Sequence, residues 1–291
     1  MKIYVFPNLD KANCKSYTIK ACEILCSNGA EIYMDQTHRN VFEGVSGIVF
    51  GGKDIIPECD YILSVGGDGT ILKCSGYASK YKKPMLGLNC GRLGFMATLE
   101  HSELHLLNDF CDGKFSLDKR MMIDVEVHFA DGTSKTFTAL NDIVVSKDSG
   151  CKIADFKVSK GEKVISALRA DGIIFSTPTG ATAYSLSAGG PIIEPSMNCI
   201  EFTQICAHSL FARSMIFDEN SVIDVGFRAN ANARAVLTVD GNEVVKLSQN
   251  DKLRIFKSES CIELIDIKGG SFFSSVNRKL MQPLKELSEE V

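Results

Sequence analysis

The sequence predicts an α/β domain with a parallel sheet, followed by an all-β domain of two packed sheets. Over the first third, short apolar runs alternate with helix-length amphipathic segments, which is typical of a parallel sheet covered by helices on both faces. From about Leu117 to Ile267, short strand-like runs follow one another with turn residues between them. A chain of 291 residues is also long enough for about two domains.

The strands expected in the first part are short and apolar, and the helices between them carry apolar residues on one face. The expected strands are Lys2–Phe6, Glu31–Met34, Tyr61–Val65 and Met85–Leu88, and the expected helices cover Ala12–Asn28, Thr70–Lys80 and Leu104–Phe110. Gly29 is a good C-terminal stop for the first helix. Val45–Phe50 fits either a strand or the end of a helix. Ligands bind where the strands of such sheets end, and Asp68 and Asn89 follow two of these ends.

In the second part, Met121–Phe129 and Lys135–Val145 are expected to pair as a hairpin around the turn Asp131-Gly132. The remaining expected strands are Phe156–Val158, Val164–Leu168, Ile173–Ser176, Val222–Phe227, Arg234–Val239, Val244–Leu247, Lys252–Phe256 and Ile262–Ile267. Ser271–Glu290 predicts a final amphipathic helix, which has no helical partner in the β region and is therefore expected to return to the first domain. The predicted domains are residues 1–116 with 270–291, and residues 117–269.

Composition argues against several classes of protein. The net charge is −4 and no Lys/Arg run stands out, which argues against a nucleic-acid-binding protein. No apolar run reaches about 18 residues, so no membrane span is expected. The eleven cysteines are scattered without a Cys-x-x-Cys pair and the five histidines do not cluster with carboxylates, so no metal site is expected. With no export signal, reduced thiols indicate a cytoplasmic protein.

The stretch Gly66-Gly67-Asp68-Gly69-Thr70 follows an expected strand and opens the next helix. Glycines let a ligand approach the backbone, and the N–H groups at a helix start favour an anion. Gly66, Gly67, Gly69 and Thr70 are therefore expected to bind phosphate, with Thr70 as the helix cap. A carboxylate repels phosphate, so Asp68 calls for another reason, and the best one is that it accepts a proton from an incoming hydroxyl. The alternative is a plain Asp-Gly turn.

Three further blocks carry polar groups suited to a nucleotide. Ser176–Pro191 places a hydroxyl-rich turn and a helix-like segment after a strand, where hydroxyl and N–H groups can bond phosphates or sugars. Asn141-Asp142 suits a ribose diol, although a turn explains it equally well. The alternative for Ser176–Pro191, a Ser/Thr-rich loop, is the less favoured one, and Asp240-Gly241-Asn242 alone indicates a β-hairpin turn. The chain has no P-loop, no protein-kinase signature set and no G-x-G-x-x-G, which argues against an ordinary dehydrogenase.

Together these blocks resemble the NAD kinase family over most of the chain. The matching motifs, in the family's order and spacing, are Gly66–Thr70, Asn89–Phe95, Asn141-Asp142, Asp171-Gly172 and Ser176–Gly190. The Gly-Gly-Asp-Gly turn is shared with diacylglycerol-type lipid kinases and phosphofructokinases, so Ser176–Gly190 is the most specific of these motifs. The resemblance implies a Rossmann-like N-terminal domain, a β-sandwich second domain, and a homodimer or homotetramer.

The resemblance also implies the reaction, which moves the γ-phosphate of ATP to the 2′-hydroxyl of the adenosine ribose of NAD and gives NADP. Asp68 would be the base that takes the hydroxyl proton, and Mg²⁺ would ride on the nucleotide phosphates. The residues that the resemblance implies for NAD binding are Asp68, Gly69, Asn141, Asp142, Lys152, Arg169, Asp171, Thr182, Ala183, Tyr184, Ser185, Ser187 and Asn242.

Two positions depart from the family pattern. Asp142 stands where the family usually has Glu, and Asn242 where it often has Gln; each side chain is shorter by about 1.5 Å, which bears on direct contact with NAD.

A lipid or sphingoid kinase and a non-catalytic dinucleotide sensor are the two alternative functions. A lipid or sphingoid kinase would need an apolar stretch free to line an acyl channel, and none is seen. A non-catalytic dinucleotide sensor is disfavoured by Asp68, because binding alone would favour removing a negative charge beside phosphate. The donor could be ATP or polyphosphate, and NADH could be a second acceptor.

Overall fold

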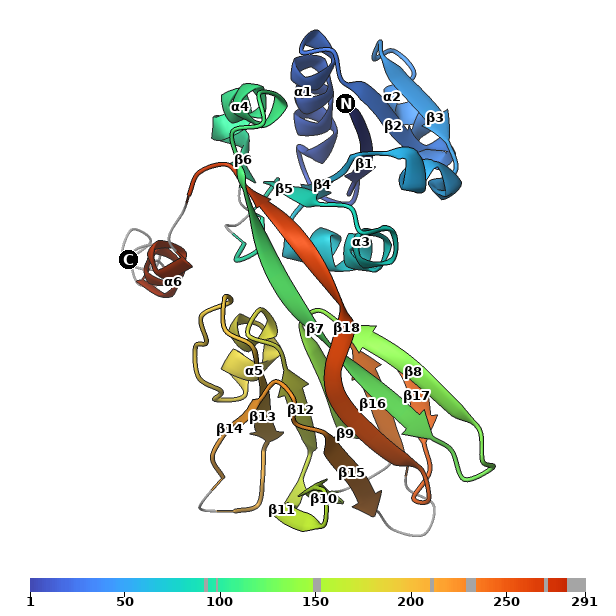
Figure 1. Ribbon diagram of the computed structural model, residues 1–291, viewed down its shortest axis with the longest axis vertical. Coiled ribbons are helices and arrows are strands. Elements are labelled where there is room, and N and C mark those ends of the chain that lie inside the picture. The colour runs from blue at the N-terminus through green and yellow to red at the C-terminus, as the bar shows by residue number, and fades with distance from the viewer. Residues whose placement is uncertain are drawn as a thin grey trace, which may run out of the picture. The chain divides into compact units, whose positions relative to one another are not determined.

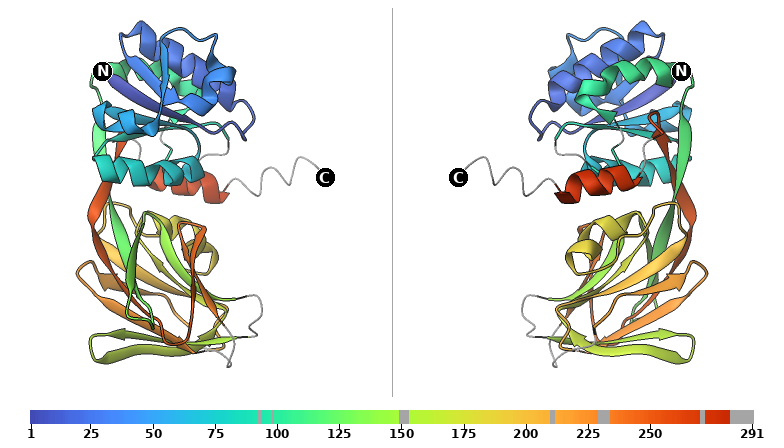
Figure 2. Two further views of the ribbon diagram at one scale, coloured as in Figure 1. Left: turned by 90° about the vertical axis from the view of Figure 1, so that its right-hand side faces the viewer. Right: turned by 90° about the vertical axis from the view of Figure 1, so that its left-hand side faces the viewer.

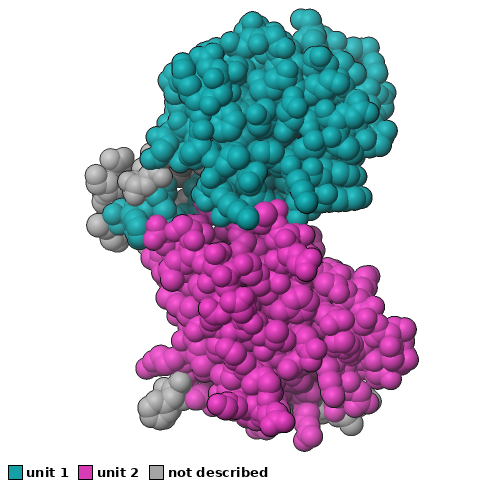
Figure 3. Space-filling model, in the orientation of Figure 1, with its two compact units in different colours: residues 1–119, 262–291 teal, residues 120–261 magenta. Residues whose placement is uncertain are grey.

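The computed structural model describes residues 1–91, 94–97, 99–148, 153–209, 212–228, 234–269 and 272–281. The chain divides into two compact units, shown in teal and magenta in Figure 3. Unit 1 comprises residues 1–119 and 262–291, and unit 2 comprises residues 120–261. None of the described helices combines the length and the apolar character needed to cross a membrane.

Unit 1 is built on a parallel sheet with the strand order β3-β2-β1-β4-β5. Its strands are β1 (Lys2–Pro7), β2 (Glu31–Asp35), β3 (Ile48–Gly51), β4 (Tyr61–Gly66) and β5 (Met85–Asn89), with the short β6 (Leu99–Glu100) beside β5. Val5 of β1 lies between Met34 of β2 and Leu63 of β4, and all three side chains are buried. The order reverses between β1 and β4, which is the switch point where sheets of this kind bind ligands.

Helices cover both faces of this sheet. The α-helices are α1 (Cys14–Ser27), α2 (Arg39–Phe42), α3 (Asp68–Tyr81), α4 (Leu107–Cys111) and α6 (Phe272–Met281), and the 3₁₀ helices are η1 (Gln36–His38), η2 (Lys53–Glu58) and η3 (His101–Leu106). α1 and α4 lie side by side on one face and α3 lies on the other (Figures 1 and 2). Right-handed crossovers that leave β1 and β4 in opposite directions require this arrangement. Gly29 ends α1 with a φ of +79°, as predicted.

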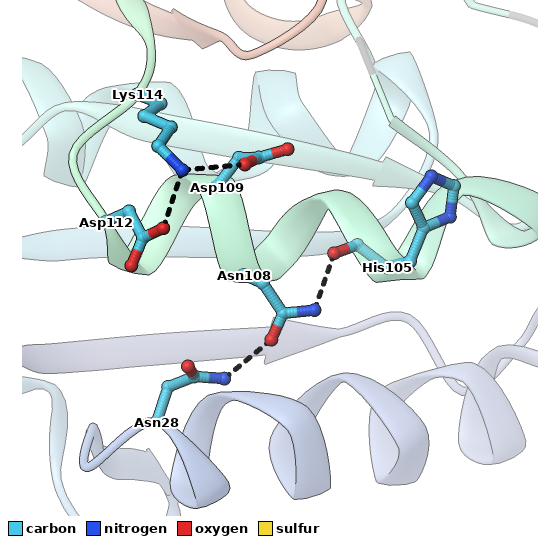
Figure 4. A network of polar contacts seen from close by, with 6 residues as sticks. All are labelled: Asn28, His105, Asn108, Asp109, Asp112 and Lys114. Carbon is cyan, nitrogen blue, oxygen red and sulfur yellow. Dashed lines mark hydrogen bonds and ion pairs between the residues drawn. The ribbon is translucent and has the colours of Figure 1, made fainter.

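A polar network on the surface of unit 1 ties the end of α1 to α4 (Figure 4). The Asn28 amide donates to Asn108 Oδ1 over 2.9 Å. Lys114 Nζ lies 3.4 Å from Asp109 and 2.8 Å from Asp112. Exposed ion pairs of this kind contribute little to stability, so removing the charge of Asp109 is a mild change that serves below as a control.

Unit 2 contains two layers of antiparallel strands. One sheet has the order β14-β13-β12-β9-β16-β17, and the strands of the other run β11-β10-β15-β18, with β7 beside β18 and β8 beside β7. The bounds are β7 (Ser116–His128), β8 (Ser134–Ala139), β9 (Asp142–Lys147), β10 (Ala154–Lys160), β11 (Lys163–Ala170), β12 (Gly172–Ser176), β13 (Cys199–Ile205), β14 (Met215–Asp218), β15 (Ile223–Arg228), β16 (Ala235–Val239), β17 (Asn242–Leu247) and β18 (Lys252–Asp266). Inward side chains of both layers, such as Phe175 and Phe156, form one apolar core. The predicted fold class is therefore confirmed.

Several element predictions need correction. The hairpin partner of β7 ends at Ala139, and the next strand, β9, belongs to the other sheet, where it pairs with β12 and β16. Asn141-Asp142, expected inside the strand Lys135–Val145, therefore lies at the start of a new strand, which begins at Asp142. Lys252–Asp266 is one long strand rather than two, and the sequence pattern did not predict β13 and β14. The final helix is described for Phe272–Met281, in unit 1, where the Phe272 ring lies 6.4 Å from that of Phe95.

Candidate active site

The glycine turn, Gly66–Thr70, leads from β4 into α3 at the switch point of the unit 1 sheet. A Cβ on Gly67 would stand 2.6 Å from Lys11 Nζ, and one on Gly66 would stand 3.0 Å from the Cβ of Asn8. Gly66 therefore needs to be glycine, because a Cβ there would also stand 2.9 Å from the Cβ of Thr70, whereas at Gly67 the contact is with the flexible end of the Lys11 side chain. Around Gly69 a Cβ would meet nothing within 4 Å, so this backbone stays open to a ligand.

The Thr70 side chain binds Asn8 and does not cap the helix as predicted. α3 begins at Asp68, and its N-cap residue, Gly67, has no side chain with which to cap. The buried Thr70 hydroxyl accepts a hydrogen bond from the Asn8 amide over 3.1 Å, and the Thr70 N–H donates to the Gly67 carbonyl. The prediction that Thr70 caps the helix was wrong, because the helix starts two residues earlier than the pattern indicated.

The carboxylate of Asp68 is held by three backbone amides of the segment after Gly94. Phe95 N–H donates to Oδ2 over 2.7 Å, and the Met96 and Ala97 N–H groups each donate to Oδ1 over 3.1 Å. A Cβ on Gly94 would stand 2.6 Å from the Asp68 Cγ, so only glycine fits there. A carboxylate has about four lone-pair positions, so one position on Oδ2 remains for an incoming hydroxyl proton.

Lys11 and Asn8 were not predicted as site residues, yet both lie at the glycine turn. Lys11 Nζ donates to the Gly66 carbonyl over 3.3 Å, and the Asn8 N–H donates to the Val65 carbonyl over 2.9 Å. A usable signal was present in the sequence, since these residues follow the expected first strand. What was missing was the strand order, which alone shows that β1 and β4 are neighbours at the switch point.

In unit 2, Leu140, Asn141 and Asp142 form a bend that we call the Asn–Asp corner. The carboxylate of Asp240 accepts the backbone N–H groups of all three residues, at 2.8, 2.7 and 3.1 Å respectively. Asn141 and Asp142 are each only 6% exposed, and Asn141 Oδ1 has no hydrogen-bond partner among the described residues. A buried acceptor without a partner is unfavourable, so the corner is suited to a ligand that brings a hydroxyl donor.

A buried carboxylate, Asp142, and a partly buried one, Asp240, meet at this corner. Burial, and then the charge of Asp240, raises the pKa of Asp142 to about 7. Burial also raises the pKa of Asp240, while the hydrogen bonds from the three amides oppose that rise. Asp142 therefore exchanges its proton near neutral pH, where it can act as either donor or acceptor toward a hydroxyl.

The Ser176–Gly190 segment is locked onto the Asn–Asp corner by its first residues. Thr177 N–H donates to the Asn141 carbonyl over 2.9 Å, and its hydroxyl donates to the Leu140 carbonyl over 2.5 Å. A Cβ on Gly180 would stand 2.6 Å from the Cα of Asn141, so the two backbones touch at a glycine. The 3₁₀ helix η4 (Gly180–Thr182) and the short helix α5 (Tyr184–Ser187) follow directly.

Within Thr182–Ser187, the side chains divide into an inner and an outer set. Tyr184 and Ser187 are exposed, whereas Ser185 is fully buried and its hydroxyl donates to Glu201 over 2.7 Å. Thr182 is half-buried, and its hydroxyl donates to the Thr179 carbonyl over 3.2 Å. Ser185 was predicted to bind NAD, but its hydroxyl is already bonded to Glu201.

Arg169 and Asp171 lie at the far end of β12 from the Asn–Asp corner. Ser176, which pairs with Asp142, ends this strand, and Gly172 begins it, so the strand separates the two groups by roughly 13 Å. Arg169 Nε lies 2.7 Å from Asp155, and Asp171 lies 2.7 Å from Lys147 Nζ.

Of the last two predicted residues, Asn242 lies in the described part of the chain. Asn242 is exposed at the start of β17, and its amide donates to the Asp240 carbonyl over 3.2 Å. Lys152 lies outside the described residues.

The raised pKa of Asp142 gives a testable dependence of stability on pH. Because its folded-state pKa of about 7 lies above the ordinary 3.8, the folded protein binds the proton more tightly than the unfolded chain. Stability from this group is thus complete below about pH 4 and is lost as the pH rises through 7, by at most about 1.4 kcal/mol per pH unit. We expect the Tm of Asp142→Asn to fall less between pH 5 and pH 8 than the Tm of the native protein. Asp155→Asn, an exposed and ion-paired control, should keep the native slope; equal slopes for native protein and Asp142→Asn would contradict the assignment.

Comparison with known proteins gives a consistent result for both units. Residues 3–115 match the ATP-NAD kinase N-terminal domain, and residues 140–267 match the ATP-NAD kinase C-terminal domain. The chain is 34% identical over 285 residues to the NAD kinase of Caldanaerobacter subterraneus subsp. tengcongensis, covering 97% of this chain and 99% of that one. It is 35% identical over 289 residues to the NAD kinase of Lachnoclostridium phytofermentans, covering 96% and 98%.

Two solved structures share the fold. Yeast NADH kinase complexed with NADH has a TM-score of 0.85 at 23% identity and covers 97% of this chain and 88% of that one. An NAD kinase from Archaeoglobus fulgidus in complex with ATP has a TM-score of 0.72 at 23% identity and covers 97% and 99%. At this identity the likeness bears on the fold alone.

Proposed function

Because the chain belongs to the NAD kinase family, we propose that it transfers the γ-phosphate of ATP to the 2′-hydroxyl of the adenosine ribose of NAD and so forms NADP. The observation that carries the proposal is the carboxylate of Asp68, which three amides fix at the start of α3 with one acceptor position left on Oδ2. A ribose hydroxyl is a weak nucleophile until its proton has an acceptor, and an aligned carboxylate supplies one.

In this mechanism Asp68 Oδ2 takes the proton of the 2′-hydroxyl while the ribose 2′-oxygen bonds to the γ-phosphorus of ATP. The bond from that phosphorus to the β,γ-bridging oxygen breaks, and ADP leaves. The open backbone at Gly69 and the ammonium group of Lys11 suit the negative charge of phosphates. Mg²⁺ when bound would neutralise phosphoryl charge; we expect it on the nucleotide phosphates, because amides already occupy most acceptor positions of Asp68.

For the dinucleotide, we propose contacts in unit 2 from Asn141, Asp142 and the exposed side of α5. The buried Asn141 Oδ1 and the Asp142 carboxyl would bind ribose hydroxyls, and the Tyr184 ring offers an apolar face with a polar tip. The further proposed contacts are Gly69, Lys152, Arg169, Asp171, Thr182, Ala183, Ser187 and Asn242. Arg169 and Asp171 would meet a different part of the ligand from Asn141, since β12 lies between them. We also propose that the protein works as a cytoplasmic homodimer or homotetramer.

The test is NADP formation from NAD with ATP and Mg²⁺, with EDTA as the control for the metal. Parallel reactions would replace ATP with polyphosphate, and NAD with NADH or diacylglycerol. We expect NADP from NAD and ATP. Phosphorylated lipid without NADP would favour a lipid kinase, and calorimetric NAD binding without any NADP would favour a dinucleotide sensor.

A further inference from the structure

A buried acid on β13 faces away from the core of unit 2. On this strand Ile200 and Phe202 point into the apolar core, and Glu201, between them, points to the other side. Glu201 is fully buried; its Oε1 accepts hydrogen bonds from the hydroxyls of Ser185 over 2.7 Å and Thr203 over 2.8 Å. Its Oε2 has no partner among the described residues. Fully buried glutamates are rare, so this one calls for a reason.

Glu201 is the centre of a small network of hydroxyl groups. The Ser185 and Thr203 hydroxyls lie 3.1 Å apart, and the Thr203 hydroxyl lies 2.8 Å from that of Ser214. A Cβ on Gly190 would overlap Glu201 Oε1, and the Gly190 N–H donates to the Ser185 carbonyl over 2.9 Å. Burial raises the pKa of Glu201, while the bonds from Ser185 and Thr203 oppose the rise. Helix α5, the turn after it and β13 therefore all meet at one carboxyl group.

The carboxyl group of Glu201 holds a helix, α5, that is too short to be stable on its own. α5 spans four residues, Tyr184–Ser187, and isolated helices of that length are unstable in water. Its inward residue is Ser185, and its outward residues are Tyr184 and Ser187. Without the 2.7 Å bond to Glu201, the fully buried Ser185 hydroxyl would keep only the Thr203 hydroxyl, at 3.1 Å, as an acceptor, and the loss of the charged acceptor disfavours the inward placement.

We propose that Glu201 is a positioning residue that fixes α5 through Ser185, so that Tyr184 and Ser187 are presented to the dinucleotide. The inference rests on the proposed role of α5 in NAD binding. In it the Ser185 hydroxyl bonds to Glu201 rather than to NAD. Glu201 touches neither substrate nor the reacting atoms; it acts on the affinity for NAD through the helix.

Steady-state kinetics of three variants test the proposal. Glu201→Ala removes the acceptor, and we expect KM for NAD to rise about tenfold, the effect of about 1.4 kcal/mol, while kcat changes little. Glu201→Gln keeps an acceptor oxygen and should restore most of the affinity. Ile200→Val is the matched control, because it removes a buried methylene from the neighbouring residue on the core side of the same strand. It should lower Tm and leave KM unchanged.

Hydrogen exchange supplies a readout that does not depend on activity. The N–H groups of Ala188, Gly189 and Gly190 all donate to carbonyls of α5, so they report on its order. Faster exchange at 188–190 in Glu201→Ala, but not in Ile200→Val, together with the rise in KM, supports the proposal. A KM for Glu201→Ala no higher than that of Ile200→Val, or unchanged exchange at 188–190, would overturn it. If the native protein formed no NADP, the proposed function would fail, and exchange with calorimetric NAD affinity would still decide the role of Glu201.

Discussion

Replacing Asp68 by asparagine is expected to lower kcat for NADP formation about 10²–10⁴-fold, the usual contribution of a general base, while NAD binding persists. Asparagine has nearly the same shape, and its oxygen can still accept the amides of Met96 and Ala97, which now bond to Oδ1. Its NH₂ group cannot take a proton from the ribose. It also faces the Phe95 N–H, which would lose its acceptor. Tm and calorimetric NAD affinity should therefore be measured beside kcat.

Asp109→Asn is the matched control for this experiment. It removes one negative charge from unit 1 at an exposed position on α4 whose partner is Lys114 (Figure 4), and it should leave kcat unchanged. If Asp68→Asn turned over NAD at nearly the native rate, the assignment of Asp68 as the base would be wrong. A fall in kcat matched by an equal loss of NAD affinity and Tm would point to the 95–97 segment instead.

Replacing Asp240 by alanine is expected to abolish measurable NADP formation at NAD concentrations that saturate the native protein. Three buried N–H groups would lose their acceptor, at about 1–3 kcal/mol each, and two of them belong to Asn141 and Asp142. Asp240 also has a φ of +47°, a conformation that aspartate and asparagine tolerate better than alanine. The Asn–Asp corner should therefore lose its geometry, and KM for NAD should rise steeply.

A graded variant and a matched control separate this loss from general unfolding. Asp240→Asn keeps an oxygen for the amides of Asn141 and Asp142, which share Oδ1, and should fall between native protein and Asp240→Ala in KM. Asp251 is a buried carboxylate in unit 2 that, like Asp240, accepts backbone N–H groups, those of Ala130 and Ser248. Asp251→Ala should lower Tm without a comparable rise in KM. Equal KM changes in Asp251→Ala and Asp240→Ala would mean that Asp240 has no special role.

Sequence reasoning succeeded where the information is local. β1, β2, β4 and β5 of unit 1 were predicted because short apolar runs show directly in the pattern, whereas β3 was left open and β6 was not predicted. The glycine turn was predicted because its glycines and aspartate are adjacent in the chain. The prediction failed at Lys135–Val145, where the pattern shows one continuous strand. There the chain bends at Leu140–Asp142 and changes sheets, and the group that holds the bend, Asp240, lies about a hundred residues away.

The sequence by itself determined the two-domain architecture, the family and the positions of the acid and the glycines at the end of β4. Only the tertiary structure decided which groups hold those residues in place: the amides of Phe95–Ala97 around Asp68, Asp240 behind Asn141, and Glu201 behind Ser185. The physical reason is that strand and turn patterns arise from neighbouring residues, whereas a buried hydrogen bond joins whichever distant groups the fold brings together. Asp240 in an Asp-Gly turn and Glu201 in a β-strand therefore look ordinary until the chain is folded.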